Sequence, residues 1–476
     1  MEMRTLATKS SQRILVAIAS YGSGNDSFLR RMISEFRSMS FDIDIVIISN
    51  IEKYIDHQIK IVVGLPNKNP WSLPFAHKKL FVNKLEDYDL FIYAEDDILI
   101  TEANVRAFLD ATRVLREDEV AGFFRVEKGP DGMVSYPEAH SHHHWVTTSV
   151  RKRGVYTLAE FTNEHAACYM LTQAQLRKAI NSGGFDVAPH EEKYDLLCTA
   201  ATDPYTQCGL TKLIPVSHID DFTVHHMSNK YVGRIGVDGP ELSRQIEALH
   251  QIERAEAAPI SLIQAETRLW RGLYSKDYYE PAKPEVISLI PKVARSVLSI
   301  GCGRGATEIA LVESGLTVTA VPLDSVICRG AAAGGVEIIE GDFQSARGRL
   351  DGRRFDCVLL LNLLHLAPEP VKVLSSFGEL LSTAAPMIIR SPNMLNLSAA
   401  WRQIRDRRIE LPRGYATSGV HFVFQGSVEK WCRSAGLTVE HTTELLDRRV
   451  DAYDSVIPAL ARRAFAPEFI AVAKRV

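Results

Sequence analysis

The stretch VLSIGCGRG, residues 297–305, decides the fold of the second half of the chain. Residues of buried-strand character run directly into the alternating glycines Gly301, Gly303 and Gly305, and a helix-forming segment follows at residues 306–314. A strand, a glycine turn and a helix in this order present main-chain N–H groups and the positive end of a helix to a ligand. Glycine also lets the backbone approach a nucleoside closely, so the stretch predicts a nucleoside-binding turn.

Apolar runs alternate with helical segments in both halves of the chain. The strands expected in the second half are residues 317–321, 336–339, 355–361 and 386–390, with a helix over 371–381. Those expected in the first half are residues 14–19, 43–48, 59–63 and 88–93, with an amphipathic helix over 28–39. This alternation is typical of doubly wound α/β sheets.

The length of 476 residues favours more than one domain. We predict an α/β protein of two doubly wound domains, at residues 1–257 and 274–476, joined by a linker at residues 258–273.

Composition narrows the function. Hydrophobic residues make up 46% and charged residues 24% of the chain, and the net charge of -3 predicts no recruitment of nucleic acid. The seven cysteines have neither zinc spacing nor a disulfide pattern. No apolar run near the start is long enough for a signal peptide or a membrane span, so we expect a cytoplasmic protein. Peripheral membrane contact through a lipid-linked glycan stays open.

Three carboxylates, Glu95, Asp96 and Asp97, end the fourth expected strand of the first half. Open α/β sheets bind their ligands at this edge. Crowded carboxylates repel one another and lose hydration unless a cation compensates them. A Mg²⁺ or Mn²⁺ ion that bridges to a nucleotide diphosphate would do so through hard oxygen ligands. The alternative is a solvated acidic turn.

The stretches WSLPFAHK, residues 71–78, and YDLFIYAEDDI, residues 88–98, resemble the nucleotide-sugar half of GT-A glycosyltransferases. The resemblance implies a metal-dependent transferase that uses a nucleotide sugar, with Glu95 and Asp97 on the metal. The sequence departs from the family's acidic motif by having Glu instead of Asp at the first position.

The GT-A fold often returns a late histidine to the metal. The stretch FTVHHMSNKY, residues 222–231, supplies two histidines, and we expect His226 rather than His225 to be the ligand. A neutral imidazole suits Mn²⁺. The alternative places one histidine in the core and the other in solvent.

Transfer to a glycan acceptor by inversion needs a carboxylate that takes a proton from the acceptor hydroxyl. The candidates Glu191, Glu192 and Asp195 open an expected helix, where acids are also favoured for electrostatic reasons alone. The histidine-rich run HSHHH, residues 140–144, lies in a polar loop and is expected to be solvated.

Residues 274–476 resemble the class I S-adenosylmethionine-dependent methyltransferases. The resemblance rests on the stretches IGCGRG at residues 300–305, EGDF at 340–343, FD at 355–356 and NLLHL at 362–366. It implies methyl transfer from S-adenosyl-L-methionine. By family position, the three glycines pack against the cofactor, Asp342 binds the adenine amino group and Asn362 lines the pocket.

Two departures from the methyltransferase pattern concern acidic residues. The family usually has an acid before the glycine turn, where Ser299 stands. It also has an acid at the end of the second strand that grips the ribose; Pro322 stands there, and Asp324 is expected to take the role. His365 can serve as the base that deprotonates an acceptor hydroxyl, since its ordinary pKa lies near neutral pH, or it can shape the pocket.

The two resemblances together imply a bifunctional enzyme of surface-glycan biosynthesis, in which a glycosyltransferase is fused to an O-methyltransferase. Its partners would be a nucleotide sugar and a glycan acceptor. The alternatives are a methyltransferase whose first half only binds glycan or nucleotide, a non-catalytic scaffold in polysaccharide assembly, and a nucleotidyltransferase in the first half.

Overall fold

The computed structural model describes residues 12–397, 401, 403–404, 410–446 and 463–475. The chain forms two compact units. The first comprises Met1–Ala139 and Ser149–Ile246, and the second comprises His140–Thr148 and Glu247–Val476.

The first unit is built on a five-stranded sheet of order β11-β4-β1-β2-β3. Its strands are β1 (Arg13–Ser20), β2 (Asp42–Ser49), β3 (Lys60–Val63), β4 (Leu90–Glu95) and β11 (Cys168–Thr172). The first four run parallel, and β11 is antiparallel to β4. β1 and β4 are buried along nearly their whole length, as their continuous apolar runs predict.

Two smaller sheets complete the first unit. One has the order β14-β8-β7-β13-β5 and consists of β5 (Ile98–Leu99), β7 (Phe124–Lys128), β8 (Val134–Tyr136), β13 (Thr223–His226) and β14 (Val237–Asp238). The other has the order β6-β12-β10-β9 and consists of β6 (Glu119–Ala121), β9 (Trp145–Arg153), β10 (Tyr156–Phe161) and β12 (Thr211–Pro215). Only residues 149–153 of β9 belong to the first unit. In the first of these sheets β13 lies between β7 and β5, so it places its histidines beside the residues that follow β4.

The helices of the first half are α1 (Asp26–Ser38), α2 (Ala76–Asn83), α3 (Glu102–Thr112), α4 (Gln173–Asn181), α5 (Leu196–Thr206) and α6 (Gly239–Glu253). The expected helix at residues 28–39 is confirmed as α1. The segment at residues 190–195, which we expected to be helical, is not: α5 begins only at Leu196, because Asp195 is its N-cap.

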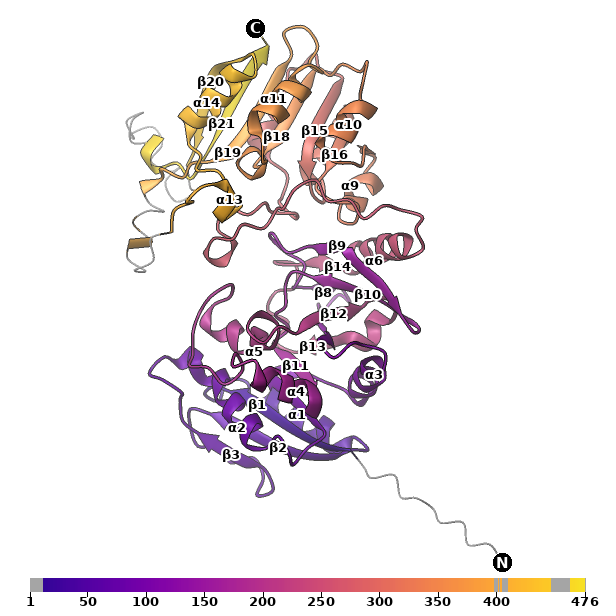
Figure 1. The fold of residues 1–476 in the computed structure, drawn as a ribbon, viewed down its shortest axis with the longest axis vertical. Helices are drawn as coiled ribbons and strands as arrows, with labels where there is room; N and C mark the ends of the chain where they lie inside the picture. The colour runs from indigo at the N-terminus through magenta and orange to yellow at the C-terminus, as the bar shows by residue number, and fades with distance from the viewer. Residues whose placement is uncertain (1–11, 398–400, 402, 405–409, 447–462, 476) are drawn as a thin grey trace, which may run out of the picture. The chain divides into compact units, whose positions relative to one another are not determined.

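The second unit contains a seven-stranded sheet of order β17-β16-β15-β18-β19-β21-β20. Figure 1 labels these strands from β16 to β20. They are β15 (Ser296–Cys302), β16 (Thr317–Pro322), β17 (Glu337–Ile338), β18 (Cys357–Leu361), β19 (Pro386–Pro392), β20 (Leu437–Leu445) and β21 (Glu468–Arg475). All pairs are parallel except those that involve β21. The predicted α/β class and the strand expected at residues 297–300, which is part of β15, are therefore confirmed.

The helices of the second unit are α7 (Pro284–Ile287), α8 (Ala306–Glu313), α9 (Arg329–Ala333), α10 (Phe343–Arg349), α11 (Pro370–Gly378), α13 (Tyr415–Ser418) and α14 (Gln425–Ser434). The expected helix at residues 371–381 is α11. Apolar side chains pack on both faces of the sheet, which leaves its carboxyl edge for polar groups.

Candidate functional site

The glycine turn of the second unit connects β15 to α8. Gly301 and Gly305 adopt the left-handed backbone that favours glycine, with φ of 81° and 86°. At Gly303 the reason for glycine is different, because a Cβ there would lie 2.2 Å from the main-chain oxygen of Tyr278. The N–H of Arg304 donates to the same oxygen at 2.8 Å. The close approach at Gly303 is therefore to the chain's own backbone, where we had expected a nucleoside.

Asp324 follows β16 and is 1% exposed. Its Oδ1 accepts hydrogen bonds from the N–H groups of Val326 at 2.8 Å and Ile327 at 2.6 Å. Its Oδ2 is buried and has no hydrogen-bond partner among the described residues. Burial raises the pKa of Asp324 to about 6. A buried acceptor left without a donor is costly, and a ligand hydroxyl would satisfy it.

Asn362 follows β18 and has a left-handed φ of 50°, which is uncommon outside glycine and often marks a functional site. Its Nδ2 donates to the Glu468 carboxylate at 2.7 Å, while its Oδ1 is buried and finds no hydrogen-bond donor in the described part of the chain. The guanidinium of Arg390 donates to both Glu468 and Glu285. Burial would raise the pKa of Glu468, but the hydrogen bonds and charge of Arg390 outweigh it and lower that pKa.

Sequence reasoning did not identify Arg390, Glu468 or Glu285. The signal that could have found them is Arg390, a cation at the end of the apolar run PMIIR of β19. A charge in a buried strand requires charged partners, but the sequence does not indicate which acids fold against it.

The acidic residues of the first unit have separate roles. Glu95 ends β4, and its Oε1 is buried with no hydrogen-bond partner among the described residues. Burial, and then the charge of Asp97, raise the pKa of Glu95 to about 8. Asp96 instead accepts hydrogen bonds from the hydroxyl of Ser20 at 2.6 Å and the amide of Asn25 at 2.7 Å. Asp96 therefore holds the loop that follows β1.

The structure brings His226, rather than His225, to the acids. His226 is 2% exposed, with its Nε2 3.0 Å from Oδ2 of Asp97 and its Nδ1 2.6 Å from Oε1 of Glu127. His225 is half-buried, with its Nε2 3.1 Å from the side-chain oxygen of Asn229. Within the described ranges, no group of three or more His, Cys, Asp or Glu side chains is arranged to hold a metal ion.

Residues 274–442 match the model of a protein family described as a methyltransferase domain. The second unit contains a methyltransferase domain. Solved methyltransferase structures align with 40% of the chain. The mitomycin 7-O-methyltransferase MmcR is 15% identical, with a TM-score of 0.28 and 52% of its own chain covered.

An S-adenosylmethionine-dependent methyltransferase from Archaeoglobus fulgidus is 19% identical, with a TM-score of 0.30 and 90% of its chain covered. One from Mesorhizobium loti is 20% identical, with a TM-score of 0.30 and 96% covered. No curated protein matches the chain. The family match does not reach residues 1–273, so the glycosyltransferase assignment of the first unit stays a prediction.

Two candidate residues of the methyltransferase domain have local structural roles. Asp342 is exposed and is the N-cap of α10, where its Oδ1 accepts from the N–H of Ser345 at 2.7 Å. This hydrogen bond is the largest cause of the lowered pKa of Asp342. His365 is 2% exposed, and its Nε2 donates to the carbonyl of Tyr274 at 2.9 Å. Burial lowers the pKa of His365 to about 4, so the imidazole is a weak base at neutral pH and the pocket-shaping interpretation is favoured.

The acceptor-base candidates of the first unit are mostly engaged. Asp195 caps α5 by accepting from the N–H of Cys198 at 2.9 Å. Glu192 is exposed and accepts from the side chain of Gln207 at 2.6 Å. Glu191 is half-buried in the turn before α5. The helix-start explanation thus accounts for Asp195, and the role of an acceptor base stays a prediction.

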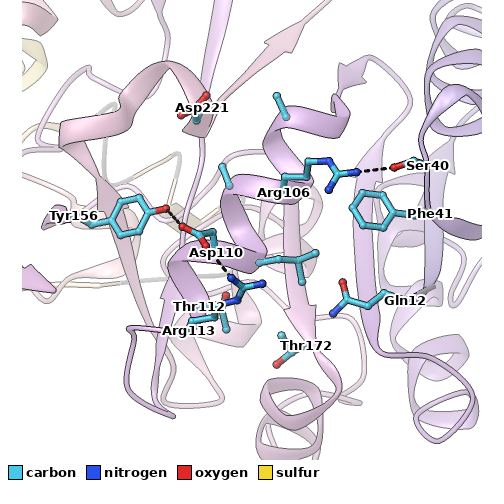
Figure 2. A pocket seen from close by; sticks show the side chains of 13 residues that line it. Gln12, Ser40, Phe41, Arg106, Asp110, Thr112, Arg113, Tyr156, Thr172 and Asp221 are labelled. Atoms are coloured by element: carbon cyan, nitrogen blue, oxygen red, sulfur yellow. Dashed lines mark hydrogen bonds and ion pairs between the residues drawn. The ribbon is translucent and has the colours of Figure 1, made fainter. Parts of the chain in front are cut away.

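A broad hollow of about 1110 Å³ lies in the first unit beside α3 and contains none of the candidate residues. Figure 2 shows that some of its polar side chains contact one another. The hydroxyl of Tyr156 donates to Asp110 at 2.9 Å, Arg113 pairs with Asp110 at 3.1 Å, and Arg106 donates to Ser40 at 2.6 Å. No helix in the described part of the chain is long and apolar enough to cross a membrane.

Proposed function

We propose that the chain is a bifunctional transferase of surface-glycan biosynthesis that acts in the cytoplasm. The methyltransferase domain would transfer a methyl group from S-adenosyl-L-methionine to a hydroxyl of a glycan. The first unit would transfer a sugar from a metal-bound nucleotide diphosphate to that glycan. The observation that carries the proposal is a buried carboxylate oxygen without a hydrogen-bond donor at each carboxyl sheet edge, on Asp324 and on Glu95.

The residues at the carboxyl edge of β15, β16 and β18 fit a sulfonium nucleoside. Oδ2 of Asp324 would accept from the ribose, and Oδ1 of Asn362 would accept from the ammonium of the amino-acid tail or from the acceptor hydroxyl. Asp342 would reach the adenine with the carboxylate oxygen that does not cap α10. The bound cofactor supplies an already activated methyl group, so these residues need only bind and align it.

In this proposal a nucleotide diphosphate would bring its divalent ion to Asp97 and His226, and the ion would take only these two ligands from the chain. The 3.0 Å between Nε2 of His226 and Oδ2 of Asp97 matches the spacing of neighbouring ligands around an octahedral ion with bonds of about 2.1 Å. Glu127 would orient His226 through its other ring nitrogen, as carboxylates commonly do for metal-bound histidines. Phosphate oxygens and water would complete the coordination by Mn²⁺ or Mg²⁺.

One observation favours the alternative in which the first unit only binds glycan or nucleotide. His226 already contacts a carboxylate with each ring nitrogen, and this arrangement is complete without an ion. A binding unit would show no sugar-nucleotide turnover. A nucleotidyltransferase in the first unit would release pyrophosphate.

The test is a crossed pair of variants, Asp97→Asn and Asp324→Asn, in thermal-shift and calorimetric titrations. S-adenosylhomocysteine should stabilise the parent and Asp97→Asn but bind Asp324→Asn weakly, because a ligand of the native state raises its melting point. A nucleotide sugar with Mn²⁺ should show the reverse preference.

The two halves of the proposal fail separately. A parent that binds no S-adenosyl compound would refute methyl transfer and support the scaffold alternative. Nucleotide-sugar binding that is unaffected by Mn²⁺ or by Asp97→Asn would refute the metal-dependent transferase.

A further inference from the structure

The histidine-rich run at residues 140–144 belongs to the second unit, although it stands far before residue 274 in the sequence. His143 and His144 are 7% and 9% exposed. The expectation of a solvated loop is therefore wrong for these two histidines. Burial of an imidazole removes its hydration, so a packed histidine needs specific contacts in return.

The contacts of this run converge on Tyr278. The carbonyl of Ser141 accepts from the N–H of Tyr278 at 2.8 Å. The ring of His144 stacks on the ring of Tyr278, with centroids 4.7 Å apart and planes at 20°. The Nδ1 of His144 donates to the carbonyl of His142 at 2.9 Å, which fixes the orientation of the stacked imidazole. The run therefore holds both the main chain and the ring of Tyr278.

A second contact fixes the run itself. A Cβ at Gly272 would lie 2.8 Å from Nε2 of His142, so the imidazole packs directly on a glycine backbone. Gly272 has a φ of 62°, a conformation that also favours glycine. The histidine-rich run therefore packs against Gly272, which lies two residues before the segment that matches the methyltransferase family.

Tyr278 in turn contacts the glycine turn. Its carbonyl accepts from the N–H of Arg304 at 2.8 Å and occupies the space that a side chain at residue 303 would fill. Its hydroxyl is buried with no hydrogen-bond partner among the described residues. Burial, and then the charge of Asp324, raise the pKa of that hydroxyl. Tyr278 is therefore the residue between the histidine-rich run and the predicted cofactor groups.

We propose that His144 is a positioning residue of the cofactor site: by stacking on Tyr278 it holds the backbone that shapes the turn at residues 301–305. The inference rests on the proposed methyl-transfer function. It extends the cofactor site to residues 140–148, outside the segment that matches the methyltransferase family. In this role the histidine-rich run does not touch the cofactor; it packs against Tyr278 and holds that residue in place.

The test uses the full chain and S-adenosylhomocysteine as the probe in isothermal titration calorimetry. His144→Ala removes the stacked ring and should weaken binding roughly fivefold, the scale of one aromatic pair. His144→Phe keeps an aromatic ring at this position, and its affinity for S-adenosylhomocysteine should lie within about twofold of that of the parent. If His144→Ala weakens binding and His144→Phe does not, the loss comes from the missing ring and not from a general loss of stability. His441→Ala, at an exposed position on β20, is the matched control and should leave the affinity unchanged.

The outcomes separate this inference from the proposed function. Equal affinity of the parent and His144→Ala would refute the positioning role alone. No binding by the parent would refute the proposed methyl transfer and this inference with it. If His144→Ala does not fold, His144→Leu replaces it with the same expected weakening, because leucine fills the volume without an aromatic plane.

Discussion

Asp324→Asn should stabilise the ligand-free protein. Asparagine has nearly the same shape and keeps one oxygen to accept from the N–H groups of Val326 and Ile327. The pKa of Asp324 is raised from 3.8 to about 6, a difference of about two units, or roughly 3 kcal/mol. The folded state therefore binds more protons than the unfolded state between these values. This contribution to stability falls as pH rises, and a neutral amide escapes the loss.

The same substitution should weaken the cofactor site. The Oδ2 that has no hydrogen-bond partner among the described residues is the atom expected to accept from a ribose hydroxyl. A hydrogen bond to a charged group contributes about 1.5–3 kcal/mol, so the affinity for S-adenosylhomocysteine should fall roughly 10- to 100-fold. Gain of stability and loss of binding at one residue would identify a carboxylate retained for its ligand.

Scanning calorimetry at pH 5 and pH 7 measures the first effect. The unfolding transition to follow is the one whose melting temperature S-adenosylhomocysteine raises in the parent. The variant should melt above the parent at pH 7, with a smaller difference at pH 5, because the contribution of the parent carboxyl falls by about 1 kcal/mol over this range. Titration calorimetry measures the second effect. A variant that melts below the parent at pH 7, or that binds the ligand as tightly, would refute the reasoning.

Three further results are expected. Gly303→Ala places a methyl group 2.2 Å from a main-chain oxygen, so it should lower both the melting temperature and the affinity for S-adenosylhomocysteine. The control is Gly348→Ala in α10, where an added Cβ meets nothing within 4 Å, and it should stabilise the fold by up to about 1 kcal/mol. Equal effects of the two substitutions in calorimetry would contradict this prediction. Glu468→Ala removes the hydrogen-bond acceptor of the Asn362 amide and should weaken the binding of S-adenosylhomocysteine roughly tenfold. The binding of 5′-methylthioadenosine should not change, because this compound lacks the amino-acid tail. Titrations that show equal losses of affinity for both compounds would exclude a contact with the tail. Burial lowers the pKa of His365 to about 4, so this histidine should not titrate between pH 6 and pH 8. The rate of methyl transfer, measured over that range, should therefore have the same pH dependence in the parent and in His365→Gln.

Much of the fold could be predicted because parallel sheets have a strong local signature. A strand buried on both faces is a continuous apolar run, as in β1, β4 and β15. Of the two antiparallel strands of the second unit that no expectation covered, β20 has only one buried residue and presents no such run. The other, β21, contains the buried apolar run FIAVA, a local signal that sequence reasoning did not identify. In the smaller sheets, β5 and β14 are only two residues long each and carry no sequence signal.

The candidate sites were predictable where residues are close in sequence, and beyond that only for His226, which a family resemblance placed beside Asp97. The acids that end β4 and the glycine turn are local motifs, and the structure places both at carboxyl sheet edges. The contacts of His226 with Glu127 and of Asn362 with Glu468 join residues about a hundred positions apart. No spacing rule predicts such pairs, since the pairing of β13 with β7 and the position of β21 determine them.

Hydrogen bonding separates two kinds of acid that look alike in the sequence. Asp195 and Asp342 each accept main-chain N–H groups at a helix start, so the fold alone accounts for them. Asp324 and Glu95 each keep a buried oxygen that no described donor reaches, and burial raises the pKa of both. Folding alone gains nothing from such a group, because a neutral residue would be less costly there. The difference ranks Asp324 and Glu95 above Asp195 and Asp342 as residues that bind ligands.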